Sequence, residues 1–140
     1  MDKRDLVKTA LDFMLAELNK LGVTGTNADT DKRTCWRTQR GEYLLEWGVV
    51  RRSKSHGMPY IRVLGKEFDH LEPLDDFAAI VFHTKNPGWQ PLVDPEQDDM
   101  PKEFRDFWTF ARQNRFGFKD NDKAAEMIRN LVESFNRLPE

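Results

Sequence analysis

The chain has 140 residues, about the commonest length of a single domain, and 33% of them are charged. Its four Trp, ten Phe and two Tyr exclude a disordered chain, and no window approaches 18 consecutive apolar residues, which excludes a membrane-spanning helix. The formal net charge is only −2. We therefore expect one domain over residues 1–140 whose core forms without help from disulfides or metal.

The N-terminus begins with a charged amphipathic pattern and shows no apolar signal region. Cys35 is the single cysteine, so no internal disulfide can form, and this fits a reducing compartment. We predict a cytoplasmic protein that does not enter a membrane and needs no cofactor.

Two amphipathic helices are predicted near the ends of the chain. Apolar residues recur at 4-3-4-3 spacing from Val7 to Leu21 and again from Ala124 to Leu138, which is typical of helices that bury one stripe. A shorter helix should begin at Pro101 and end before the break at 114–120. These stripes predict core packing, although a homodimer through the terminal helices stays open.

Residues 33–65 read as three antiparallel strands, 33–38, 42–52 and 59–65, joined by short turns. Alternation places Leu45, Trp47 and Ile61 on the buried face. On the other face it places Tyr60 and Arg62, which we expect to be exposed to solvent.

Residues 67–101 are harder to interpret. The apolar run 78–83 fits a buried strand or a helix equally well, and we favour a short helix, with a fourth strand over 78–84 as the alternative. Residues 85–101 hold Pro87, Pro91, Pro95 and Pro101 and several acids, which predicts a proline-rich acidic loop. The expected architecture is a single α+β domain, an antiparallel sheet of three to four strands packed by the terminal helices.

Charge is segregated along the chain. Residues 32–66 hold nine Lys or Arg against two acids, a net of +7, whereas residues 67–101 hold nine acids against Lys85, a net of −8. Arginines beside an aromatic platform suit phosphates and bases, so a basic sheet face that binds nucleic acid is one interpretation. The alternative is that the acidic block lies over the basic one and neutralises it.

The sequence shows no pattern typical of a catalytic site. Phosphate-binding glycine loops are absent, and His56, His70 and His83 lack the spacing of metal ligands on a helix. Cys35 is better explained as a small buried residue than as a nucleophile. Glu42 and Glu46 share a strand face but have no close catalytic lysine in a nuclease-like arrangement. We predict no catalytic residues and no metal site.

The leading hypothesis is a small non-catalytic interaction protein, of the inhibitor, immunity or adaptor type, that engages a protein partner through its charge-segregated surface. Trp89, on the predicted loop, is a candidate interface anchor. The alternatives are a nucleic-acid binder using the basic sheet face, and an enzyme or small-molecule binder with the acidic loop as a lid over His70 and His83. The predicted partner-binding residues are Arg51, Arg52, Lys54, His56, Tyr60, Arg62 and Trp89.

Overall fold

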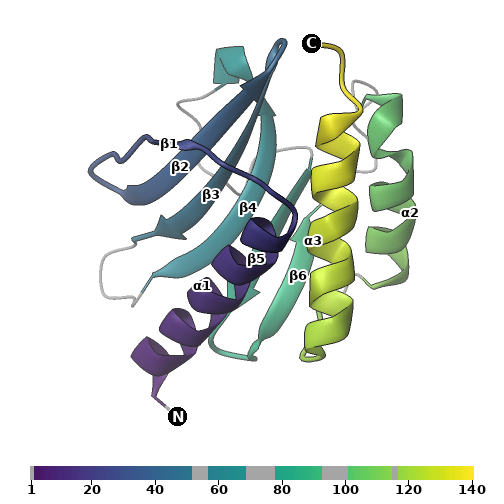
Figure 1. The fold of residues 1–140 in the computed structure, drawn as a ribbon. Helices are drawn as coiled ribbons and strands as arrows, with labels where there is room; N and C mark the ends of the chain where they lie inside the picture. Colours follow the sequence, from purple (N-terminus) through teal and green to yellow (C-terminus); the bar gives the residue numbers. More distant parts are fainter. Residues whose placement is uncertain (1, 52–56, 69–77, 93–100, 115–116) are drawn as a thin grey trace.

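An antiparallel sheet with helices packed on one face forms the body of the protein (Figure 1). The structure, a computed structural model, describes residues 2–51, 57–68, 78–92, 101–114 and 117–140. Within these ranges its helices are α1 (Lys3–Lys20), η1 (Lys66–Phe68), η3 (Lys102–Phe104), α2 (Arg105–Gln113) and α3 (Asn121–Asn136). Its strands are β1 (Thr26–Asn27), β2 (Arg33–Arg40), β3 (Tyr43–Val50), β4 (Met58–Gly65), β5 (Ala78–His83) and β6 (Gly88–Leu92).

The six strands follow one another in the sheet in chain order, each antiparallel to the next. The α+β class agrees with the sequence, but the prediction of three to four strands was wrong. Two further strands come from segments predicted as loops, because β1 pairs with β2 and β6 pairs with β5. The favoured short helix over 78–83 was also wrong, since these residues form β5 beside β4.

Strand β6 lies inside the segment predicted as a proline-rich loop. Pro91 is tolerated there because β6 is the last strand of the sheet and pairs with a strand on one side only. The missing backbone N–H of proline therefore interrupts no hydrogen bonds to a strand on the other side. Beyond β6, the backbone of Phe118 bonds to Trp89 in both directions, with N···O distances of 2.8 and 2.6 Å. A Cβ on Gly88 would lie 2.4 Å from the Phe118 carbonyl oxygen, so this close approach requires glycine.

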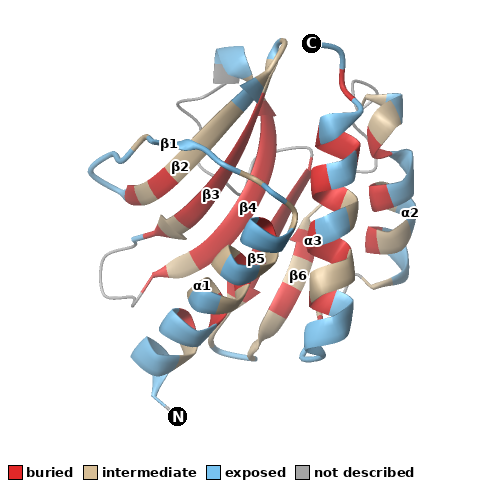
Figure 2. Ribbon diagram, in the orientation of Figure 1, coloured by how far each residue is buried: buried red, intermediate tan, exposed pale blue. Residues whose placement is uncertain are grey.

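The main core lies between the helices and one sheet face. Figure 2 shows buried residues along the strands and on the helix stripes that face them. Helix α1 contributes Val7, Ala10, Met14 and Leu18, the stripe expected from its spacing. Helix α3 contributes Ala124, Met127, Ile128, Leu131, Val132 and Phe135. Both stripes are buried in the core of the single chain. A homodimer through the terminal helices stays a prediction, and it would need other surfaces of these helices.

Both long helices begin at the residue types that favour a helix start. The Asp2 side chain accepts the Asp5 N–H at 3.0 Å, and the Asp120 side chain accepts the Asp122 N–H at 2.8 Å. Gly22 follows α1 with a φ of 72°, a conformation that glycine adopts at no steric cost. In the part of the chain that the structure describes, no helix combines the length and apolar character needed to cross a membrane.

Candidate functional site

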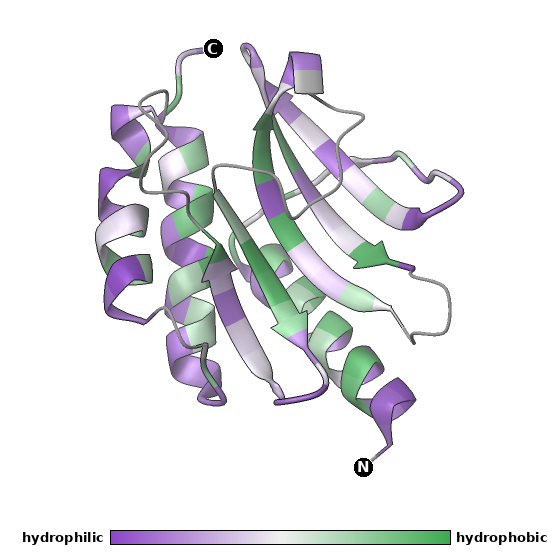
Figure 3. Ribbon diagram, turned by 180° about the vertical axis from the view of Figure 1, so that it is seen from behind, coloured by the Kyte–Doolittle hydropathy of each residue, from purple (hydrophilic) through white to green (hydrophobic). Residues whose placement is uncertain are grey.

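A buried ionic network occupies the sheet face opposite the helices. Glu46 on β3 lies directly across from Arg37 on β2 and from Arg62 on β4, so strand register alone puts three charged side chains in one row. In the view from behind, Figure 3 shows hydrophilic positions between hydrophobic ones on part of the sheet, while β5 is hydrophobic along most of its length. Alternation therefore gives this sheet two different faces, one apolar and one partly charged.

Both oxygens of the Glu46 carboxylate accept hydrogen bonds. Arg37 donates from Nε to Oε1 at 2.5 Å, while Arg62 Nε and the Tyr60 hydroxyl donate to Oε2 at 2.8 and 2.7 Å. A third guanidinium, from Arg33, comes within 3.7 Å of Oε2. Glu46, Tyr60 and Arg62 are 0% exposed, so this network is part of the interior.

The network keeps Glu46 ionised. Burial by itself would raise the pKa of this carboxyl, but the charge of Arg62 and the hydrogen bonds from Tyr60, Arg62 and Arg37 outweigh it and hold the pKa below its usual value. Burial and the adjacent negative charge of Glu46 raise the pKa of Tyr60, which therefore stays a hydrogen-bond donor. These groups hold fixed charge states near neutral pH, which suits a structural element better than proton transfer.

Cys35 lies beside this network in a small apolar cluster with Val50, Tyr60 and Val81. Its thiol donates to the Ala28 carbonyl oxygen at 3.2 Å. Burial, followed by the negative charge of Glu46, raises the pKa of the thiol. The thiol is therefore protonated and buried, as expected for a packing residue rather than a nucleophile.

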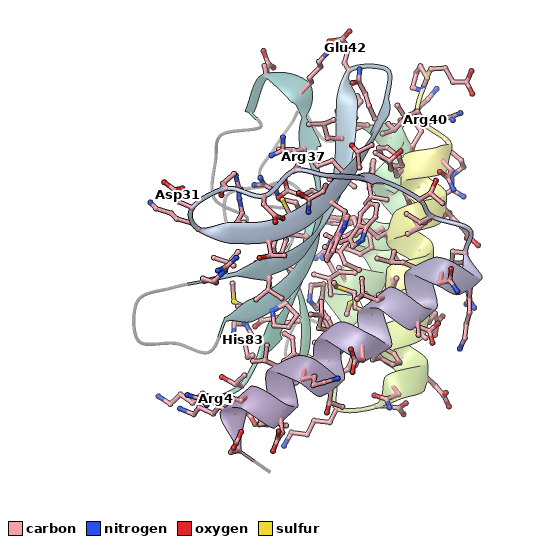
Figure 4. The ribbon with its side chains drawn as sticks, turned by 60° about the vertical axis from the view of Figure 1, so that its left-hand side comes forward. Arg4, Asp31, Arg37, Arg40, Glu42 and His83 are labelled. Carbon is pink, nitrogen blue, oxygen red and sulfur yellow. The ribbon has the colours of Figure 1, made fainter. Side chains whose placement is uncertain are left out.

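Two grooves lie at the sheet end where β5 turns into β6. The larger, of about 540 Å³, is lined by residues of that turn and of the segment before α3: His83, Lys85, Asn86, Pro87, Gly88, Gln90, Gly117, Phe118 and Lys119. Figure 4 shows His83 at this end of the molecule. The described part of its lining carries two lysines and a histidine and no carboxylate.

The second groove, of about 370 Å³, lies between α1 and β6 and is mostly apolar. Its lining is Leu6, Thr9, Ala10, Phe13, Phe82, Pro87, Gly88, Trp89, Phe118, Lys119 and Asn121. Four of these residues, Pro87, Gly88, Phe118 and Lys119, also line the first groove, so the two are contiguous. We call the two together the hairpin-end groove.

The structure places some of the predicted partner-binding residues at the surface and others in the interior. Arg51 is exposed at the end of β3, where its guanidinium donates to the Thr34 hydroxyl. Tyr60 and Arg62 are buried, so the expectation that they face solvent was wrong, and their hydrogen bonds to Glu46 compensate for the loss of contact with water. Arg52, Lys54 and His56 lie outside the described residues. His70, named as a lid-covered residue, lies outside them too.

Trp89 is 3% exposed and packs edge-on against Phe82, with ring centroids 5.3 Å apart. It was expected on a loop, but it lies in β6 and belongs to the main core. Sequence reasoning missed the role of Glu46 as the acceptor of the arginines. The available signal was that Glu46 lies in the middle of the predicted strand 42–52, on its outer face, between two predicted strands that bear arginines.

Among the described residues, no three His, Cys, Asp or Glu side chains gather where they could hold a metal ion. Comparisons of the chain with protein-family models, with curated proteins and with solved structures found no match. The functional argument therefore depends on this chain's own residues.

Proposed function

We propose that this protein is a small, non-catalytic, cytoplasmic interaction protein, of the inhibitor, immunity or adaptor type, which binds a protein partner. The observation that carries the proposal is the hairpin-end groove, whose lining includes two exposed lysines. Lys85 and Lys119 line the groove, and Arg51 is exposed at the same end of the sheet, where β3 ends and β5 turns into β6. An apolar surface with a charged rim is the usual composition of a protein interface.

The buried network supports a non-catalytic role. The Glu46 carboxylate is fully engaged by Arg37, Tyr60 and Arg62, and each arginine takes part in further interactions. Cys35 is buried and protonated, which also supports a non-catalytic role. Glu46 and Cys35 therefore belong to the interior of the sheet.

Affinity capture from native lysate of the source cells tests the proposal. The wild-type chain should retain a protein partner at low salt and lose much of it at moderate salt, because exposed charges are screened. Arg51→Glu should reduce capture severalfold. Lys66→Glu is the matched control, since Lys66 is an exposed residue at the opposite sheet end, after β4. No captured protein, or equal capture by the Arg51 variant and wild type, would contradict the proposal.

Nucleic-acid binding through the basic sheet face is the second candidate. It draws support from the exposed Arg51 and Lys32, but burial of Arg62 and Tyr60 weighs against the face first expected to bind. A labelled oligonucleotide at low salt distinguishes the two. Tight binding that Arg51→Glu abolishes, without a captured protein, would replace the protein-partner proposal.

A further inference from the structure

We infer that the hairpin-end groove is a docking site for an acidic peptide segment that carries one bulky apolar side chain and belongs to a partner protein. This inference rests on the proposed function and names the partner chemistry. A cationic groove and an apolar groove lie next to each other here, because both are lined by Pro87, Gly88, Phe118 and Lys119.

The apolar half has an aromatic floor. Trp89 contacts Phe82 and Phe13, with ring centroids 5.3 and 6.4 Å apart, and Phe118 also lines this half. Leu6 and Phe13 on α1 are only half-buried, so their apolar surface stays accessible. A leucine or phenylalanine of a partner would bury further apolar area there, which favours binding.

The cationic half selects the charge of the partner. Lys85 and Lys119 are exposed and His83 is half-buried, and no described lining residue of either groove is an acid. Two acids next to lining residues have partners of their own: Asp12 pairs with Lys8 at 2.7 Å, and Asp120 caps α3. Charge complementarity therefore favours carboxylates flanking the apolar side chain.

The groove wall is held in place before any partner arrives. The two backbone hydrogen bonds between Trp89 and Phe118 fasten residues 117–119 to the edge of β6, and Gly88 permits the close approach. Gly117 has a φ of 84°, which positions the chain for this contact. A wall fixed by backbone bonds costs little conformational entropy on binding.

Fluorescence anisotropy with short labelled peptides tests the inference. The probe is a peptide of Asp, Glu, Gly and Ser with a central Leu or Phe. One control has Ala at the centre, and the other has Lys in place of the acids. The acidic peptide with the apolar centre should bind about tenfold or more tightly than either control, which corresponds to about 1.4 kcal/mol.

Groove variants locate the binding. The double variant Lys85→Glu with Lys119→Glu should weaken binding of the acidic peptide about tenfold or more. Its matched control is Lys66→Glu with Lys102→Glu, which reverses the charge of two exposed lysines outside the groove. Leu6→Ser should weaken binding of the Leu- and Phe-centred peptides but not of the Ala-centred peptide. Thermal unfolding of each variant checks that the fold persists.

The outcomes separate this inference from the proposed function. If the acidic peptide binds no better than its controls, or binds the groove double variant as it binds wild type, the peptide site is wrong. Capture of an Arg51-dependent partner would then still support the proposed function. If the peptide binds as expected but lysate yields no partner, the peptide site stands and the proposed function fails. An oligonucleotide that needs Lys85 and Lys119, with no peptide binding, overturns the inference.

Discussion

Glu46 and Arg62 face each other across β3 and β4, with 2.8 Å between Oε2 and Nε and neither side chain exposed. Arg37 approaches the other carboxylate oxygen from β2. One acid therefore joins three consecutive strands through side chains as well as through backbone pairing. This relationship removes Arg62 from the surface and gives the basic residues of the sheet a structural role.

Replacing Glu46 should destabilise the fold strongly. Glu46→Gln leaves the buried guanidinium of Arg62 and the partly buried one of Arg37 without their carboxylate, and removal of one partner of a buried ion pair costs about 3–5 kcal/mol. Urea denaturation measures the free energy of unfolding. Glu42→Gln, at an exposed position before β3, should change it by less than about 0.5 kcal/mol. Equal stability of the Glu46 variant and wild type would show that the network contributes little.

Stability should depend on pH through the same carboxyl. The folded pKa of Glu46 lies below its unfolded value of about 4.3, so the unfolded chain binds the proton more tightly. The contribution of Glu46 is therefore complete above about pH 5 and is lost as pH falls through the folded pKa. Denaturation at several pH values should show a smaller acid loss for Glu46→Gln than for wild type. Glu42→Gln should retain the wild-type slope.

The Cys35 thiol should react slowly in the folded protein. It is 0% exposed, and burial and the charge of Glu46 raise its pKa, so the reactive thiolate is scarce near pH 8. A chromogenic disulfide reagent should label Cys35 at least tenfold faster in denaturant than in buffer. Fast labelling of the native chain would show that the thiol reaches solvent and would contradict its assigned place in the core.

Trp89→Ala should destabilise the protein by about 3–5 kcal/mol, because the side chain is buried against Phe82 and Phe13. Trp108→Ala is the comparison: Trp108 is half-buried, with the Arg112 guanidinium 4.4 Å from its ring centroid, and it should cost less than about 2 kcal/mol. Thermal and urea unfolding measure both. A small effect of Trp89→Ala would instead favour the interface anchor that the sequence suggested.

Gly48→Ala should also destabilise the sheet. A Cβ at Gly48 would lie 2.0 Å from the Thr34 carbonyl oxygen and 2.7 Å from Cα of Cys35, on the neighbouring strand. Such overpacking costs about 1–3 kcal/mol, to be measured by urea unfolding. At Gly22, φ is 72° and no neighbour lies within 4 Å of an added Cβ. Alanine there should lower the free energy of unfolding by only about 1 kcal/mol, the energy of holding a residue with a Cβ in the left-handed conformation.

Much of the fold follows from local pattern. The 4-3-4-3 spacings predicted α1 and α3, and alternation in the predicted strands 42–52 and 59–65 assigned Leu45 and Ile61 to the core face, where the structure places them. These predictions hold because helix and strand periodicity record which face is buried. The sequence also predicted the α+β class, but it predicted three to four strands where the sheet has six.

Tertiary pairing decided the rest. Residues 78–83 and 88–92 are strands because each has a neighbouring strand to pair with, which no local pattern reveals. Likewise, the distribution of charge along the chain predicted a basic surface. The strand register places Glu46 between Arg37 and Arg62, and this pairing lies in the interior instead. A buried carboxylate that satisfies several arginines depends on distances between strands, and those distances are set by the folded sheet. The hairpin-end groove has the same origin, since α1, β6 and the segment before α3 meet only in three dimensions.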